Sequence, residues 1–173
     1  MPGVDLGERA LASTIALARG AGLHRDPTSD PTVAALVPGA ARGWCFAACL
    51  RVLAGLVGTP ALPDLGGALL ALEDIDERPY QVDRDLNQLH RSGALAGIVG
   101  LVFGRFPASL PPDYGGPSMP DLCAGWAKRL GVPAIFGLPF GHDADPLTLA
   151  CGRKAQIEVA AGGWSLDLAP RAP

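Results

Sequence analysis

The alternation of apolar and polar residues along the chain predicts the helices and strands of an α/β protein. Apolar residues recur at helical spacing over residues 5–19, and Gly20 follows where that helix would end. Residues 21–43 hold three prolines among polar residues, which indicates a linker or an irregular wrap. A short helix is predicted over residues 46–56, before a Gly-Thr-Pro turn.

The middle of the chain carries its most distinctive pattern, an apolar run that ends abruptly in an acid. Residues 67–73 are typical of a strand that finishes at Glu73, and a tight acidic turn follows. A helix is predicted next over residues 83–92. Asp83 is its expected N-cap, and Gly93 is the expected residue beyond its C-terminus.

The rest of the chain predicts two strands with a helix between them and then a terminal hairpin. In order, these are a strand at 96–103, a proline-rich loop at 107–120, a helix at 120–130, a strand at 133–137, and hairpin strands at 154–160 and 164–168. The order β-α-β-α-β-β-β predicts an α/β domain over residues 41–173, preceded by a helical and irregular N-terminal extension over residues 1–40.

Composition narrows the class of protein. Hydrophobic residues make up 49% of the 173 residues, enough for a sizeable core. A net charge of −3 argues against nucleic acid or an anionic membrane as the main partner. No apolar run reaches the length of about 18 residues that a membrane span needs, and the N-terminus lacks the pattern of a signal peptide. Four cysteines without a Cys-x-x-Cys pair favour a reduced, cytoplasmic protein.

Two residues are candidate catalytic groups. Glu73 lies at a predicted strand end, and His142 lies in a Gly-Pro-rich turn 69 residues later. A carboxylate that orients a histidine is part of a Ser-His-Glu triad, in which the histidine moves the proton. From the residues alone, Glu73 also fits a group of solvated turn acids with Asp74, Asp76 and Glu77, and Glu77 is its rival for the catalytic role. None of the six serines lies in a Gly-x-Ser-x-Gly sequence, so the nucleophile of such a triad is missing.

The other reactive side chains favour structural roles. Asp83 and Arg84 fit a helix cap and a first-turn surface residue, and Arg78 either meets a substrate carboxylate or neutralises neighbouring acids. The acids match no calcium loop or oxygen cage, so neither a metal nor another cofactor is expected. Cys45 and Cys49 share one face of the predicted helix and are interpreted as small buried residues.

A set of short motifs lies in a fixed order along residues 41–168. They are Leu53-Ala54-Gly55-Leu56-Val57-Gly58-Thr59-Pro60, Leu72-Glu73-Asp74, Pro79-Tyr80, Asp83-Arg84, Gly100-Leu101-Val102-Phe103-Gly104, Gly131-Val132-Pro133, Gly141-His142 and Leu147-Thr148-Leu149. As a set they resemble the C-terminal domain of the LD-carboxypeptidase family, the S66 serine peptidases. That family includes muramoyltetrapeptide carboxypeptidases and microcin C self-immunity proteins.

The resemblance implies a swivelling β/β/α-type domain, with a mixed sheet flanked by helices, in which Glu73 and His142 match the two triad positions. The family's serine lies in a separate N-terminal domain, on an elbow reading roughly Gly-Tyr-Ser-Asp, and nothing in this chain matches it. Residues 1–40 resemble the tail of that domain and the connector. The resemblance therefore implies the Glu-His half of a serine peptidase that cleaves an L,D-amide, such as the one before the terminal D-Ala of a muropeptide. This half is expected to be inactive without a serine-bearing partner domain or chain.

Two alternatives stay open. Ala47-Ala48-Cys49 stand where the family tends to have Gly-Gly-Asn, and together with the absent serine this fits a non-catalytic module that binds a peptide or forms a homodimer. The chain also fits a truncated product of a longer reading frame. In that case apolar surface is expected where the missing domain would dock.

Overall fold

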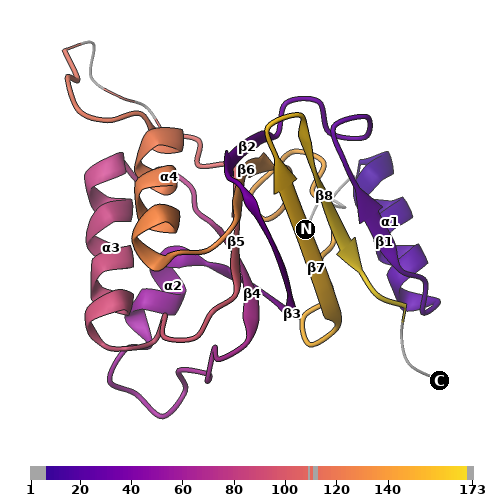
Figure 1. Cartoon of the computed structure of the whole chain (residues 1–173), viewed down its shortest axis with the longest axis horizontal. Helices are drawn as coiled ribbons and strands as arrows, with labels where there is room; N and C mark the ends of the chain where they lie inside the picture. Colours follow the sequence, from indigo (N-terminus) through magenta and orange to yellow (C-terminus); the bar gives the residue numbers. More distant parts are fainter. Residues whose placement is uncertain (1–6, 109, 111–112, 171–173) are drawn as a thin grey trace, which may run out of the picture.

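The computed structural model describes residues 7–108, 110 and 113–170, which form an eight-stranded mixed sheet with helices on both sides (Figure 1). The strands are β1 Leu23–Arg25, β2 Ala34–Val37, β3 Gly39–Cys49, β4 Ala68–Glu73, β5 Gly100–Gly104, β6 Ala134–Leu138, β7 Lys154–Ala160 and β8 Gly163–Leu168. The helices are α1 Glu8–Ala18, α2 Leu50–Gly55, α3 Pro79–Arg91 and α4 Met119–Leu130. Across the sheet the strands lie in the order β1-β8-β7-β3-β4-β5-β6-β2. The predicted α/β class, a mixed sheet flanked by helices, is confirmed.

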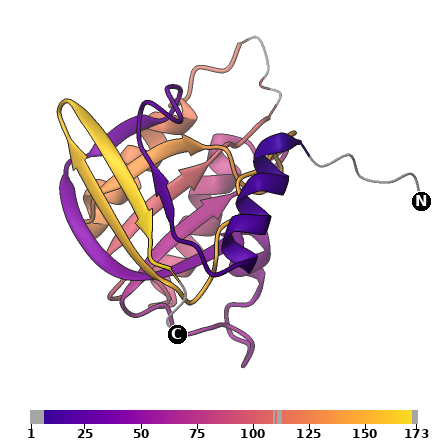
Figure 2. The same ribbon diagram turned by 90° about the vertical axis from the view of Figure 1, so that its right-hand side faces the viewer.

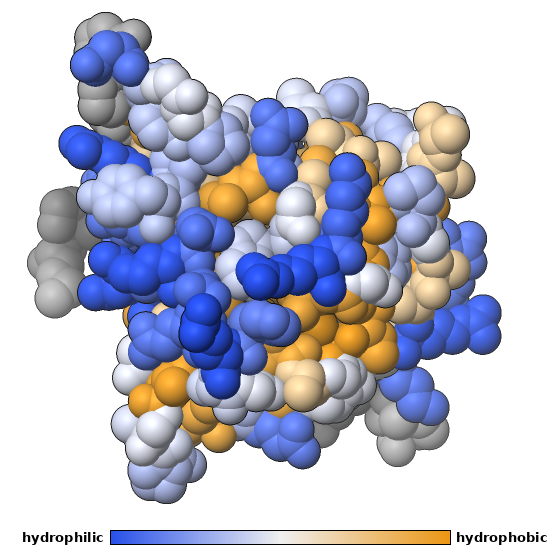
Figure 3. All heavy atoms as spheres, turned by 60° about the vertical axis from the view of Figure 1, so that its left-hand side comes forward, coloured by the Kyte–Doolittle hydropathy of each residue, from blue (hydrophilic) through white to orange (hydrophobic). Residues whose placement is uncertain are grey.

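Four parallel strands, β3 to β6, form the centre of the sheet. Every residue of β4 and β5 is buried, as expected for strands that are covered on both faces. Helices α2, α3 and α4 connect consecutive parallel strands and lie together on one face, whereas α1 lies on the opposite side of the sheet (Figure 1). Hydrophilic residues cover much of the side on which the three helices lie, and apolar patches show between them (Figure 3).

The long strand β3 joins two differently oriented parts of the sheet. Its first half, Gly39–Trp44, pairs antiparallel with β7, and its second half, Trp44–Cys49, pairs parallel with β4. The β7–β8 hairpin therefore curls over the face of the sheet opposite α2 to α4 (Figure 2). A second core forms in that fold, where Val102 of β5 belongs to the same buried cluster as Ile157 of β7 and Leu166 of β8. The β7–β8 hairpin thus covers the second face of the parallel strands, opposite the three helices.

The predictions for residues 21–56 are partly wrong. The segment 21–43, predicted as a linker or irregular wrap, supplies β1, β2 and the start of β3. These short strands gain their partners from distant parts of the chain, β1 from β8 and β2 from β6. The predicted helix over 46–56 begins only at Leu50, because residues up to Cys49 continue β3 beside β4. Cys45 and Cys49 therefore share one side of a strand rather than a helical face.

Helix α3 begins four residues before its predicted start. Pro79 occupies the first helical position, where its missing N–H costs nothing, and the Arg78 N–H donates to Oε1 of Gln81 at 2.9 Å. Asp83 therefore lies within the helix and is not its N-cap. Gly93 follows the C-cap with a φ of +83°, as predicted.

The remaining elements lie close to their predicted places. The helices at 5–19 and 120–130, the strands at 67–73 and 133–137 and the terminal hairpin are all confirmed within a few residues; the first six residues of the chain lie outside the described part. Strand β5 begins at Gly100 rather than at residue 96, because Gly97 adopts a φ of +77° in the preceding turn. None of the helices in the described part of the chain combines the length and apolar character that crossing a bilayer requires. The boundary predicted at residue 40 stays a prediction.

Candidate active site

Glu73 ends β4, and two glycines leave the space that its side chain occupies. The residue is 5% exposed, so the carboxylate is held inside the protein. A Cβ atom on Gly104 would lie 2.7 Å from Cβ of Glu73, and a Cβ atom on Gly141 would overlap the carboxyl group. Gly141 also has a φ of +76°, a conformation that residues with a side chain rarely adopt. Positions 104 and 141 therefore both need glycine if the carboxylate is to occupy this place.

His142 contacts this carboxylate twice. Its backbone N–H donates to Oε2 of Glu73 at 3.0 Å, and its Nδ1 lies 2.9 Å from the same oxygen. The backbone bond fixes the main chain beside the carboxylate, and the ring contact favours the proton on Nδ1. The histidine side chain is 51% exposed, and Nε2 has no hydrogen-bond partner among the described residues. The pair therefore joins a buried acceptor to an accessible ring, with Nε2 available for proton transfer.

The acids that follow Glu73 have separate structural tasks. Asp74 is buried, and its Oδ2 accepts the backbone N–H of Arg51 at 2.8 Å, which satisfies a free donor in the first turn of α2. The backbone N–H of Asp76 donates to the carbonyl of Pro107 at 2.8 Å. Glu77 has a buried oxygen, Oε2, without a hydrogen-bond partner in the described structure. In that part of the chain, no three His, Cys, Asp or Glu side chains gather in a way that could hold a metal ion.

A hollow of about 290 Å³ opens beside the carboxylate. It is lined by Ala47, Ala48, Cys49, Glu73, Phe140, Gly141, Leu147 and Leu149. Ala47, Ala48 and Cys49, at which a Gly-Gly-Asn sequence is expected from the resemblance, thus lie in the wall of the candidate site. Burial raises the pKa of the Cys49 thiol, and the carboxylate of Asp74, 3.5 Å from Sγ, raises it further. This thiol therefore stays protonated near neutral pH and is a poor nucleophile.

Among the described residues, no hydrogen bond or ion pair joins Asp83, Arg84 or Arg78 to the Glu73–His142 pair. Asp83 accepts the indole N–H of Trp126 at 2.8 Å, and Arg84 pairs with Asp85 at 3.0 Å. Arg78 is exposed at the N-cap of α3. In the described residues, no serine hydroxyl is hydrogen-bonded to His142, so the structure supplies the carboxylate and the histidine without a nucleophile.

Sequence reasoning missed two acids of the segment after His142. Asp143 forms an ion pair with Arg105 at 2.6 Å, and Asp145 accepts the backbone N–H of Ala10 at 2.8 Å. Asp85 was also missed: its carboxylate is 1% exposed and meets two arginine side chains. None of these pairs follows a local motif. Their only sequence signal was charge in a loop or on a helix, which usually marks solvent-exposed surface.

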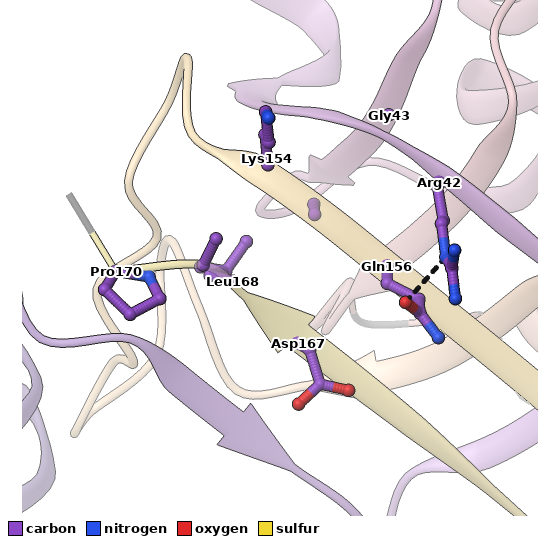
Figure 4. Close-up of a pocket in the computed structure, with 9 residues that line it drawn as sticks. Arg42, Gly43, Lys154, Gln156, Asp167, Leu168 and Pro170 are labelled. Atoms are coloured by element: carbon purple, nitrogen blue, oxygen red, sulfur yellow. Dashed lines mark hydrogen bonds between the residues drawn. The ribbon is translucent and has the colours of Figure 1, made fainter. Parts of the chain in front are cut away.

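Larger hollows lie elsewhere in the described structure. One of about 650 Å³ is lined by residues of β3, β7 and β8, including Arg42, Lys154, Gln156 and Asp167, and by Pro170, which follows β8 (Figure 4). Nε of Arg42 donates to Oε1 of Gln156 at 2.8 Å across its floor. Asp167 in its lining also contacts a histidine, His24, at 2.6 Å, but both of those side chains are largely exposed, whereas the carboxylate of Glu73 is buried. Size therefore does not decide the site; a buried carboxylate paired with an accessible histidine does.

Comparison with known proteins finds the same family and the same fold. The family model of the LD-carboxypeptidase C-terminal domain matches residues 42–157. A Streptomyces coelicolor protein whose carboxypeptidase activity is itself inferred is 41% identical over 133 residues, covering 76% of this chain and 42% of its own length. The solved muramoyltetrapeptide carboxypeptidase of Oxalobacter formigenes superposes with a TM-score of 0.80 at 31% identity, covering 98% of this chain and 57% of that one. A MccF-like protein of Bacillus anthracis shares the fold, with a TM-score of 0.65 at 20% identity, over 80% of this chain and 43% of its own. The chain thus spans about half the length, or less, of the proteins it matches.

Proposed function

This chain belongs to the LD-carboxypeptidase family through its C-terminal domain, and from that membership we propose that Glu73 and His142 are the acid and base of a serine peptidase. The observation that carries the proposal is the 2.9 Å contact between Nδ1 of His142 and the buried Oε2 of Glu73. Oriented in this way, the ring presents Nε2 to a hydroxyl group. The nucleophile comes from a serine-bearing domain or chain that these residues do not include.

In the proposed reaction, Nε2 of His142 takes the proton of the serine hydroxyl as the serine oxygen attacks the amide carbonyl. The imidazolium then returns the proton to the leaving amine as the carbon–nitrogen bond breaks. Glu73 remains ionised and stabilises the imidazolium through Nδ1–H. Water enters next, and the same histidine assists its attack on the acyl-serine ester. The residues of this chain thus move the proton, while the partner supplies the covalent step.

The substrate class that we propose is a peptide with an L,D-amide, such as the bond before the terminal D-Ala of a muropeptide. The name of the Oxalobacter protein supports this class, because that protein is a muramoyltetrapeptide carboxypeptidase. A reaction on such recycled cell-wall peptides fits a cytoplasmic setting. In the proposed assembly, the serine-bearing domain lies against the edge where His142 is exposed.

The test is a chimera in which this chain replaces the matched part of the Oxalobacter enzyme. Release of D-Ala from a muramoyl tetrapeptide is measured by a coupled D-amino-acid oxidase assay. We expect activity in the chimera, none in the isolated chain, and a loss of about 10⁴-fold or more in kcat for Glu73→Gln and for His142→Ala. His90→Ala is the matched control, because His90 is an exposed helix residue in edge-to-face contact with Trp126, and its loss should leave the rate unchanged.

A non-catalytic peptide-binding module is the second candidate. Ala47, Ala48 and Cys49 in the wall of the hollow favour it, because small and thiol side chains replace the polar amide of the family pattern. In that case the folded chimera stays inactive, and Glu73→Gln changes binding of the tetrapeptide rather than its turnover. Isothermal titration with the tetrapeptide distinguishes the two candidates.

A further inference from the structure

Helix α1 is capped by an acid from the segment that carries His142. Oδ1 of Asp145 accepts the N–H of Ala10 at 2.8 Å, and Oδ2 accepts the N–H of Arg9 at 3.1 Å. The N-cap residue, Gly7, has no side chain to perform this task, and a Cβ atom there would overlap the Asp145 carboxyl group. A carboxylate from the far end of the chain therefore satisfies the free donors of α1 and complements the positive end of its dipole.

Two further contacts extend this attachment along the helix. The N–H of Thr148 donates to Oγ of the buried Ser13 at 3.0 Å, and the hydroxyls of Thr14 and Thr148 lie 2.7 Å apart. At the other end, the Arg153 guanidinium donates to the carbonyl of Leu17 at 2.7 Å. The acidic Asp145 thus binds the N-terminal end of α1 and the basic Arg153 binds its C-terminal end. Each charge is favourable for the helix dipole at the end where it lies.

The segment held in this way, residues 139–153, contains neither helix nor strand. Side-chain and turn contacts therefore fix its path. On the side of the sheet, Glu73 binds His142 and Arg105 pairs with Asp143 at 2.6 Å. On the other side, Asp145 and Thr148 bind α1. His142 belongs to the first set and lies only three residues before Asp145, where the second set begins.

We propose that Asp145 is a positioning residue, which by capping α1 holds segment 139–153 so that the ring of His142 stays on Glu73. Its relevance to catalysis rests on the proposed function, whereas the geometry stands on the contacts alone. Helix α1 lies outside residues 42–157, the range matched by the family model. A helix outside the motif set thus contributes to the position of His142.

The experiment is ¹⁵N and ¹H NMR on the full chain with Asp145→Ala and Asp145→Asn. One readout is the fraction of neutral His142 that carries its proton on Nδ1. The other is the exchange rate of the His142 amide, which donates to Glu73. In Asp145→Ala we expect the Nδ1-protonated fraction to fall and the amide to exchange about tenfold faster, the factor typical of losing a helix cap. Asn keeps an acceptor oxygen but not the charge, so its effect should be intermediate.

Asp121→Ala is the matched control, because Asp121 is an acid in the first turn of α4 and makes no contact with segment 139–153 among the hydrogen bonds of the described residues. It should change neither His142 signal. Faster exchange of the Arg9 and Ala10 amides in Asp145→Ala, with both His142 readouts unchanged, would overturn the proposal. If the alanine variant does not fold, Asp145→Asn decides by the same signals. These readouts need neither serine nor substrate, so an inactive chimera refutes the proposed function and leaves this inference standing.

Discussion

Gly141 is the residue on which the geometry of the candidate site depends most directly. Substitution by alanine meets two separate obstacles. The backbone has a φ of +76°, and the new Cβ atom would overlap the carboxyl group of Glu73. The first obstacle is general to left-handed backbone, and the second is specific to this site.

A matched glycine separates the two effects. Gly152 has a φ of +81°, and a Cβ atom there meets nothing within 4 Å. Gly152→Ala should therefore lower the free energy of unfolding through backbone strain alone, by about 1 kcal/mol. Gly141→Ala must in addition displace the carboxylate and lose its two hydrogen bonds to His142, so we expect about 3–5 kcal/mol in total. In thermal terms, at roughly 2–4 °C per kcal/mol, the two variants should differ in Tm by about 5 °C or more.

The assay is urea unfolding followed by circular dichroism, for the wild type and both glycine variants. Adding Glu73→Ala completes a double-mutant cycle, because removing the carboxyl group removes the overlap. The combined Gly141→Ala and Glu73→Ala variant should then be more stable than the sum of the single effects by about 1 kcal/mol or more. Equal destabilisation by Gly141→Ala and Gly152→Ala, or strict additivity in the cycle, would refute the proposed packing of Gly141 against Glu73.

Two further predictions concern ionisable groups. Burial raises the pKa of the Cys45 thiol to about 12. A thiol reagent at pH 8 should therefore label the exposed Cys151 in the native protein, and Cys45 only after unfolding. Mass spectrometry that finds Cys45 labelled in the native state would contradict this. The hydrogen bond with Asp167 raises the pKa of His24 above its ordinary value of 6.5. The stability that this pair supplies is therefore fully present below pH 6.5, and it is lost as the pH rises through the higher pKa of the folded state. In urea unfolding, Asp167→Asn should thus destabilise the protein at pH 5 and much less at pH 9.

Strands β4 to β6 could be predicted from the sequence because their signals are local, whereas the choice of Glu73 and His142 also needed the resemblance to the LD-carboxypeptidase family. A run of apolar residues ending in Glu73 indicates a buried strand wherever it occurs, and Gly141 marks the turn that presents His142. The N-terminal half of the sheet could not be predicted in the same way. Strands β1 and β2 are short and partly exposed, and they depend on β8 and β6, which follow them by more than 90 residues. The sequence of residues 46–49 is compatible with either a helix or a strand for the same reason. Only the pairing with β4 in the folded protein makes this segment a strand.

The error at α3 has a different origin. Asp83 is a good N-cap by residue type, but Pro79 fits the first helical position better, and the helix extends to it. Asp83 is then free to accept the indole N–H of Trp126 from α4. A polar residue that caps in one context thus packs two helices together in another, and only the tertiary contact distinguishes the two roles.

The geometry of the candidate pair depends only on residues of this chain. Glu73 is positioned by β4 and by two glycines, and His142 is positioned by Glu73 through its own backbone N–H. None of these contacts requires a nucleophile, a substrate or a second domain. The contact between Glu73 and His142 is therefore measurable in the isolated chain, whereas the proposed turnover would need a serine brought to Nε2 from another domain or chain.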